Sequence, residues 1–301
     1  MFIKFEDDLL FMKAYLDICE EILKGGSMVS NRTGVDALKI NDVIFRHDME
    51  DGFPLLTTKK TAYKPIRSEL EFFIGGYTDK KWLQERGNHI WDEWCNPEKV
   101  PYGHYSEIRN AMFVERDLGP IYGFQWRHFG AEYRGFDVDY TGEGVDQLKR
   151  VVEGLKNLEG TEDRRMLVNS WNPVDINSMA LPPCHYNFRI DVTGKKLNLS
   201  WDQRSVDVPL GLPFNIASYA TLLHLLAKEA NLEEGKLTGH LGNTHIYLDQ
   251  VDGIETQLSR EPLTLPGIVT KDFTNIFDWN YMDTKLTDYK SHPEIKFPKA
   301  V

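Results

Sequence analysis

The sequence has little of what marks a membrane, secreted or metal-binding protein. It contains no run of about 18 apolar residues, so we expect no membrane-spanning helix. Its first residues, MFIKFEDD, carry acid where a signal peptide carries base. The three cysteines, Cys19, Cys95 and Cys184, are too few for a disulfide framework and lack metal-ligand spacing. We therefore expect a cytoplasmic protein without a bound metal.

An excess of basic residues is also missing. Thirty-five Lys and Arg stand against 46 Asp and Glu in 301 residues, a formal charge of −11. Because such a chain repels phosphate at long range, general binding to DNA, RNA or an anionic membrane is disfavoured, although a local pocket for one small anion stays open. The sequence lacks a Gly-rich phosphate loop, HExxH and GxSxG, which disfavours P-loop, zinc-peptidase and serine-hydrolase readings.

The order of predicted elements favours an α+β fold. Apolar spacing predicts helices over 8–24, 66–74 and 217–231, the last apolar nearly all round and therefore buried. Residues 166–171, 186–192 and 197–202 are strand candidates, and helices and strands do not alternate regularly. No repeat or linker divides the chain, so we expect one domain over 1–301, with surface insertions at about 95–118 and 130–147.

The segment Leu181-Pro182-Pro183-Cys184-His185 is the first candidate for chemistry. Two prolines fix the backbone just before a cysteine, which would hold a nucleophilic sulfur in place. A free cysteine is more often a small buried apolar residue, and by itself this segment leaves both readings open.

Basic and aromatic residues supply further candidates, each with a plain structural alternative. Arg204 and Ser205 suit a phosphate, or Arg204 is a surface ion-pair partner. Arg164 and Arg165, pointing opposite ways on a strand, suit a ligand or a partner interface, or are solvated. On a strand, His245 and Tyr247 share one face, where they could bind a sugar hydroxyl or pack in the core. Glu69 with Trp91 and Trp94 could line a pocket for a flat ligand or form the edge of the core.

Taken together, these segments resemble the thymidylate synthase family. The motifs stand in the family's order, and the chain ends in the small apolar pair Ala300-Val301. They are DGFPLLTTKK (51–60), HIWDEW (89–94), GPIYGFQWR (119–127), DRRMLVNSWNP (163–173), ALPPCH (180–185), QRSVDVPLGLPFNIASYA (203–220) and GNTHIY (242–247).

The resemblance implies a single α+β domain with a mixed sheet packed by helices, dimerising through the sheet. It implies methylation of dUMP at C5 to dTMP, with 5,10-methylenetetrahydrofolate as carbon donor and reductant and dihydrofolate as product. Cys184 matches the nucleophile that adds to C6. Arg204 would lower its pKa as well as bind phosphate. Glu69, Tyr122 and His185 match the groups that move protons, and Asn215 and Asp207 also stand at catalytic positions.

The same resemblance supplies the binding residues. Arg164 and Arg165 match a pair contributed by the neighbouring subunit, and Asn215 matches the residue that reads uracil O4 and N3–H. The implied dUMP contacts are Arg32, Arg164, Arg165, Arg204, Ser205, Val206, Asp207, Asn215, His245 and Tyr247. The implied folate contacts are Lys59, Ile90, Trp91, Trp94, Asp207, Leu210, Gly211, Phe214, Ala300 and Val301.

The match is incomplete, and two other functions stay open: one shares the first chemical steps, and the other shares only the fold. Ala62, Arg189, Pro209 and the pair Asp249-Gln250 depart from the family pattern; Asp249-Gln250 stands where Asn-His often follows HIY. A deoxyuridylate hydroxymethylase would let water capture the methylene, whereas Trp91 and Ala300-Val301 favour a dry site and hydride capture. A non-catalytic nucleotide-binding protein would not need Cys184, and the acidic composition gives an RNA-binding side role no support.

Overall fold

The computed structural model describes residues 10–101, 106–158 and 163–299. The chain forms two compact units, each assembled from separate stretches. The first unit takes residues 1–62, 192–271 and 282–301, and the second takes 63–191 and 272–281. Because the chain passes repeatedly from one unit to the other, no single linker separates them. One domain over 1–301 stays a prediction.

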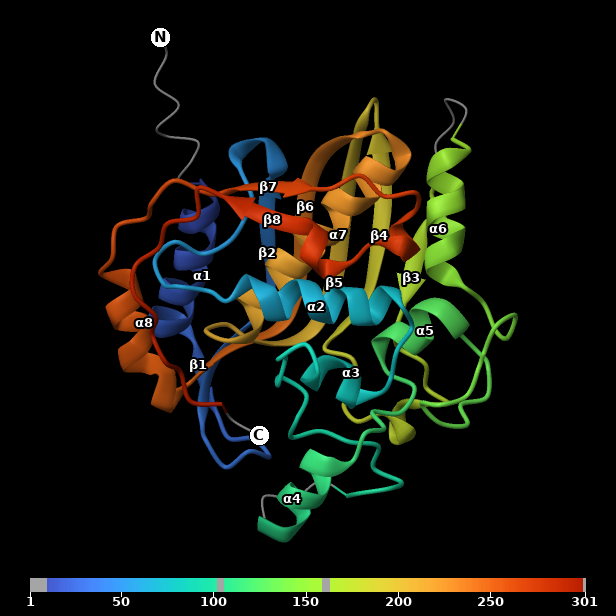
Figure 1. Ribbon diagram of the computed structural model, residues 1–301. Helices are drawn as coiled ribbons and strands as arrows, with labels where there is room; N and C mark the ends of the chain where they lie inside the picture. Colours follow the sequence, from blue (N-terminus) through green and yellow to red (C-terminus); the bar gives the residue numbers. More distant parts are fainter. Residues whose placement is uncertain (1–9, 102–105, 159–162, 300–301) are drawn as a thin grey trace. The chain divides into compact units, whose positions relative to one another are not determined.

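A mixed sheet is the centre of the first unit. Its strands run in the order β1 (Ser27–Val29), β2 (Ala37–Asp48), β6 (Glu233–Tyr247) and β5 (Lys196–Asp207). β1, β2 and β6 pair antiparallel, whereas β6 and β5 are parallel. Helix α7 (Gly211–Ala230) packs against β5 and β6 and lies over one face of these strands (Figure 1). The α+β class with a mixed sheet is therefore confirmed.

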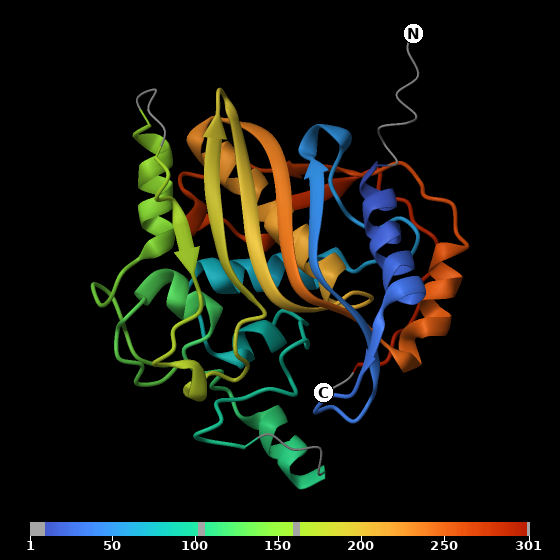
Figure 2. The same cartoon turned by 180° about the vertical axis from the view of Figure 1, so that it is seen from behind.

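The alternation in β5 explains which face α7 covers. Leu197, Leu199 and Trp201 are fully buried, and the Trp201 ring stacks on Tyr219 of α7 with centroids 5.2 Å apart. Gly239 pairs with Trp201 in the register, and a Cβ there would lie 2.4 Å from the indole ring. Only glycine therefore fits at that position. The polar residues between the buried ones point to the opposite face, and none of the described helices of this unit covers β2, β6 and β5 there (Figure 2).

Smaller elements complete the first unit. α1 (Leu10–Gly25) packs against β2 and α8 (Val251–Leu258), and β7 (Gly267–Thr270) pairs antiparallel with β8 (Thr284–Thr287). The short 3-10 turns η2 (Met49–Asp51) and η4 (Leu248–Gln250) follow β2 and β6 directly. The end of β6 therefore leads through η4 straight into α8.

The second unit is mainly helical. α2 packs on α3 and α5, α6 packs on α5 and β3, and β3 pairs antiparallel with the first half of β4. Its elements are α2 (Tyr63–Ile74), α3 (Lys80–Gln84), α4 (Ser106–Val114), α5 (Tyr122–His128), α6 (Gln147–Lys156), β3 (Leu167–Asn169), η3 (Ile176–Ser178), β4 (His185–Thr193, whose last two residues belong to the first unit) and η5 (Ile276–Asp278); η6 (Tyr281–Asp283) begins here and ends in the first unit.

The structure confirms the predicted helices and strands and corrects several boundaries. The helix predicted over 217–231 begins at Gly211, and the strand predicted over 166–171 shortens to Leu167–Asn169. The helix predicted from residue 8 is described from Leu10. Among the described residues, no helix is long and apolar enough to cross a membrane.

The two predicted insertions are not simply surface loops. The first, 95–118, contains helix α4. The second, 130–147, buries Ala131 and Tyr140 against Phe124 of α5. Buried Asp117 joins both segments, since it pairs with Lys99 at 3.0 Å and accepts a hydrogen bond from the Tyr133 hydroxyl. The sequence of these segments is mostly polar, so it did not indicate that a few aromatic residues, such as Tyr133 and Tyr140, pack against the rest of the unit.

Candidate active site

The predicted catalytic residues of the second unit meet at the start of β4. The Cys184 backbone N–H donates to the Tyr122 hydroxyl at 2.8 Å, and the Tyr122 ring stacks on His185 with centroids 4.5 Å apart. The ring of Phe73 on α2 also stacks on the Tyr122 ring, with centroids 4.9 Å apart. Burial lowers the pKa of His185 to about 3. At neutral pH His185 is therefore an uncharged imidazole that can relay a proton.

Glu69 stands on α2 next to the same aromatic group. Its Oε1 accepts a hydrogen bond from the Trp91 indole N–H at 2.7 Å, and the Trp91 ring lies edge-on to Tyr122 at 6.1 Å. Burial raises the pKa of Glu69 to about 7, although the Trp91 bond favours the charged form. A carboxyl that titrates near neutral pH suits general acid–base work. Trp91 thus orients the acid.

The turn that carries Ile90, Trp91 and Trp94 is held by polar groups that the sequence analysis missed. Lys80, 1% exposed, donates to the carbonyls of Asp92 at 3.1 Å, Trp94 at 3.0 Å and Met112. Asn88 accepts from the Ile90 N–H at 3.2 Å. A lysine in an acidic chain gives no sequence signal for this role, because its carbonyl partners are backbone groups.

The nucleotide-binding candidates of the first unit lie on paired strands. The register places Ser205 beside Asn243, and Asp207 beside His245. The His245 Nδ1 lies 2.9 Å from the Asn243 side-chain oxygen, and its ring is edge-on to Tyr247 at 5.0 Å. Burial lowers the pKa of His245. The parallel pairing of β5 with β6 therefore gathers residues that are 38 or more positions apart in the sequence.

Asn215 is oriented by a residue that the sequence analysis did not single out. On the first turns of α7, its Oδ1 accepts a hydrogen bond from Gln203 Nε2 at 2.9 Å. Gln203, 3% exposed, accepts in turn from the Trp201 indole N–H at 3.1 Å. The Asn215 amide keeps two N–H donors and one oxygen lone pair for a ligand. The strand period could have shown this, because Gln203 and Ser205 share a face of β5.

Asp207 and Lys59 form a second polar group of the first unit. The Asp207 carboxylate accepts from the Leu210 N–H at 3.0 Å and from Gln250 Nε2 at 3.0 Å, and burial raises its pKa. The Lys59 ammonium donates to the Pro209 carbonyl at 2.6 Å and lies 4.6 Å from the Phe297 ring. Burial lowers the pKa of Lys59 to about 8.

The remaining predicted residues divide by exposure. Val206 is buried; Leu210, Gly211 and Phe214 are half-buried around the start of α7; and Ala300 and Val301 lie outside the described residues. The cations Arg32, Arg164, Arg165 and Arg204 are exposed.

The strand predicted for Arg164 and Arg165 is wrong. Both lie in a turn before β3, and Arg165 pairs with Asp163 at 3.0 Å. The Asp163 carboxylate also accepts a hydrogen bond from the Arg165 backbone N–H, and this bond stabilises the turn relative to an extended chain.

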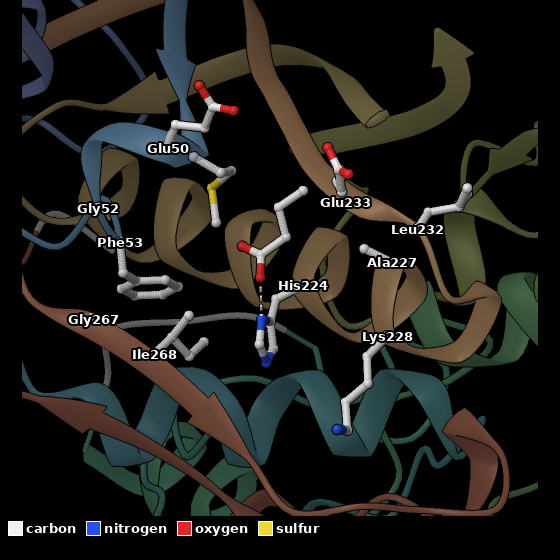
Figure 3. Close-up of a pocket in the computed structure, with 12 residues that line it drawn as sticks. Glu50, Gly52, Phe53, His224, Ala227, Lys228, Leu232, Glu233, Gly267 and Ile268 are labelled. Carbon is white, nitrogen blue, oxygen red and sulfur yellow. Dashed lines mark hydrogen bonds and ion pairs between the residues drawn. The ribbon is translucent and has the colours of Figure 1, made fainter. Parts of the chain in front are cut away.

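A hollow of about 570 Å³ opens elsewhere on the first unit, where the end of α7 meets η2 and β7 (Figure 3). Apolar Phe53 and Ile268 line it, together with His224, whose Nδ1 lies 2.6 Å from Glu234. None of the described residues predicted for catalysis or binding lines this hollow. Within each unit, the candidate functional residues are therefore the groups described above.

Comparison with known proteins agrees with the residue pattern. The family model described as thymidylate synthase matches residues 13–301. A thymidylate synthase of Staphylococcus haemolyticus is 40% identical over an alignment of 324 positions, covering 97% of this chain and 99% of that protein. A bifunctional dihydrofolate reductase-thymidylate synthase of Paramecium tetraurelia is 41% identical over 287 residues, 95% of this chain and 61% of that longer protein. From residue 13 to its end, the chain belongs to the thymidylate synthase family.

Proposed function

We propose that the protein is a thymidylate synthase that converts dUMP to dTMP, with 5,10-methylenetetrahydrofolate as the co-substrate and dihydrofolate as the second product. The observation that carries this proposal is the group of Cys184, Tyr122, His185 and Glu69. It combines a backbone-fixed thiol, a neutral imidazole and a carboxyl with a pKa of about 7. A protein that only binds nucleotides has no need of this combination.

Cys184 is the proposed nucleophile. Its thiolate forms a bond to C6 of dUMP, and the electron pair of the C5=C6 double bond moves to give an enolate at C5 and O4. This makes C5 nucleophilic, which it is not in free uracil. The family resemblance assigns Arg204 to lowering the thiolate pKa. The sulfur leaves C6 again when the product forms, so the enzyme is regenerated.

Glu69, Tyr122 and His185 handle the protons of the reaction. Removal of the C5 proton needs a base, and protonation of the co-substrate nitrogen needs an acid. Glu69 can serve both at neutral pH because its pKa of about 7 leaves both forms populated. The Tyr122 hydroxyl accepts a hydrogen bond from the Cys184 N–H and carries a proton of its own, so it can take part in proton transfer beside the thiol.

Nucleotide recognition belongs to the first unit. Asn215, fixed by Gln203, offers an N–H to uracil O4 and its oxygen to uracil N3–H. Cytosine presents the reverse pattern and leaves both groups unpaired. His245 and Tyr247 bind the ribose hydroxyl, while exposed Arg204 and Arg32 and half-buried Ser205 bind the phosphate.

The co-substrate supplies the one-carbon unit and the hydride. Asp207, Leu210, Gly211 and Phe214, with Ile90, Trp91 and Trp94, are the proposed folate contacts, and Ala300 and Val301 the proposed cover that excludes water. Lys59 is proposed to meet the glutamate tail. Its ammonium would have to leave Pro209 and Phe297 to do so.

We also propose a cytoplasmic homodimer. The face of β2, β6 and β5 opposite α7 carries the half-exposed Ile44 among polar residues, and it is the surface through which two copies would pair. In such a dimer Arg164 and Arg165 would serve the partner's site. Mixing Cys184→Ser protein with an Arg164→Ala/Arg165→Ala protein should then restore about a quarter of wild-type activity, because half of the dimers regain one complete site. No recovery would contradict the sharing.

The decisive test is mass analysis of the nucleotide after incubation with dUMP and methylenetetrahydrofolate, with dihydrofolate followed by absorbance. We expect a product heavier by one methyl replacement and one dihydrofolate for each dTMP. A hydroxymethylated nucleotide without dihydrofolate would contradict the proposal, since water would then have captured the one-carbon unit.

A further inference from the structure

The Gln250 side chain links three segments of the first unit. It is 1% exposed and stands at the end of η4. Its Nε2 donates to Asp207 Oδ2 at 3.0 Å and to the Pro298 carbonyl at 3.0 Å, and its Oε1 accepts from the Tyr247 N–H at 3.0 Å. The amide therefore joins β5, the end of β6 and the C-terminal segment 289–299.

Only a primary amide can make this set of bonds. Glutamine offers two N–H donors and one carbonyl from the same end of the side chain. A neutral histidine offers one donor and one acceptor, and a carboxylate offers acceptors alone. The bridge from Asp207 to Pro298 therefore depends on the residue type at 250, which is one of the positions where the sequence departs from the family motif.

The C-terminal segment is fastened along its length. The Tyr289 hydroxyl donates to the Leu56 carbonyl at 2.8 Å, and Arg260 donates to the Pro293 carbonyl at 2.7 Å. Further on, the Phe297 ring covers Gly253, where a Cβ would lie 2.5 Å from the ring. Phe297 also lies 4.6 Å from the ammonium of the proposed folate contact Lys59, and Gln250 connects the segment to a second proposed contact, Asp207.

The Asp207 carboxylate is held at both oxygens. Leu210 N–H binds Oδ1 and Gln250 binds Oδ2, so the carboxylate plane is fixed while each oxygen keeps a lone pair. The charged and titratable groups acting on Asp207 or influenced by it are Lys59 on the preceding segment, Asp249 beside Gln250, and Tyr15 on α1. A loss of Gln250 would leave this buried carboxylate with one bond fewer.

We propose that Gln250 is a positioning residue for the folate half of the site: it fixes the Asp207 carboxylate and ties it to Pro298, so that the C-terminal segment and Asp207 are ordered together before any ligand binds. This inference rests on the proposed function for the role of Asp207. It predicts that Gln250 acts more strongly on folate binding than on dUMP binding, which it reaches through the Tyr247 backbone N–H.

Three variants separate this role from general stability. Gln250→Leu removes all three bonds, and Gln250→His keeps one donor and one acceptor. Arg260→Met is the control, because it removes the bonds to the Pro293 and Thr58 carbonyls without touching Asp207. Each is compared with wild type by thermal unfolding, by trypsin cleavage after the exposed Lys296 without ligands, and by KM and kcat for both substrates.

For Gln250→Leu we expect faster cleavage after Lys296. We also expect the KM for methylenetetrahydrofolate to rise about 10- to 100-fold, because the variant loses one hydrogen bond to a charged group. The KM for dUMP should change less than the KM for folate, because Gln250 bonds the Tyr247 backbone N–H and not the hydroxyl proposed to meet the ribose. The acid limb of kcat/KM for folate should move to higher pH, because Asp207 loses a bond that favours its charged form. Gln250→His should lie between Gln250→Leu and wild type.

Two results would overturn the inference. One is a Gln250→Leu protein with wild-type folate KM, whatever its cleavage rate, since Gln250 would then act on the segment alone. The other is Arg260→Met raising the folate KM as much as Gln250→Leu, since segment order alone would then suffice. If wild type forms no dTMP, the proposed function fails; unchanged cleavage of Gln250→Leu would still disprove the tie to Pro298. Gln250→His serves the same purpose if Gln250→Leu does not fold.

Discussion

The candidate polar residues of the two units differ in how their surroundings act on them. In the second unit, burial among aromatic side chains raises the pKa of Glu69 and lowers the pKa of His185. In the first unit, the polar groups Asn215 and Asp207 are held by specific hydrogen bonds from Gln203, Leu210 and Gln250. Desolvation tunes protonation, whereas a hydrogen-bond network fixes direction.

This difference indicates a division of labour. Proton transfer needs a pKa near the working pH, which an apolar surrounding supplies. Discrimination between bases needs donors and acceptors that cannot rotate, which a network supplies. Variants at Cys184 and Glu69 should therefore remove chemistry and spare dUMP binding, whereas variants at Asn215 and Gln203 should change the choice of base.

The largest effect is expected for Cys184→Ser. Serine is a far poorer nucleophile at neutral pH, so turnover should fall to the detection limit. The Kd for dUMP, measured by titration calorimetry, should stay within about threefold because the Cys184 contact with Tyr122 uses the backbone N–H. Near-normal turnover would refute the covalent step, and lost dUMP binding would refute the division of labour.

Glu69→Gln should lower kcat by about 10²- to 10⁴-fold. The amide still accepts the Trp91 bond but cannot exchange a proton at neutral pH. The pH–rate profile of the wild type should show a limb near pH 7 that the variant lacks. A variant with the same limb would assign that ionisation to another group.

The same substitution should change stability in a pH-dependent way. The folded pKa of Glu69 is about 7 against 4.5 for the free side chain, so the folded protein binds more protons between these values. The wild-type free energy of unfolding therefore falls as pH rises from 4.5 to 7 and stays lower above it. Glu69→Gln removes this loss, at most about 3 kcal/mol. Urea unfolding at pH 5 and pH 8 measures it, and equal differences at both would contradict the assignment.

A smaller effect is expected for Asn215→Asp in the first unit. A protonated carboxyl can match cytosine, whereas the amide matches uracil, so the dUMP/dCMP ratio of kcat/KM should shift by about 5- to 150-fold toward dCMP. Gln203→Leu should relax the same ratio, because it releases Asn215 from its bond. An unchanged ratio in both variants would show that Asn215 does not read the base.

Much of the secondary structure followed from local patterns. Helix α2 and strands β4 and β5 are continuous segments whose apolar period is visible in the chain. The pattern did not predict helix α4 within 95–118, because its apolar spacing is weak, nor the packing of Tyr133 and Tyr140 on Phe124, because that helix lies elsewhere in the sequence. The turn at Arg164 and Arg165 was missed because Asp163 stabilises it with side-chain bonds that a strand period does not register.

The sequence by itself determined the family, the α+β class and the residues that carry the motifs, because these are properties of residue identity and order. The tertiary structure alone decided what surrounds each of them: the burial that brings Glu69 to a pKa of about 7, the Gln203 bond that aims Asn215, and the Gln250 bridge from Asp207 to Pro298. Desolvation and hydrogen-bond direction depend on atoms from distant parts of the chain, and only folding brings those atoms within a few ångströms.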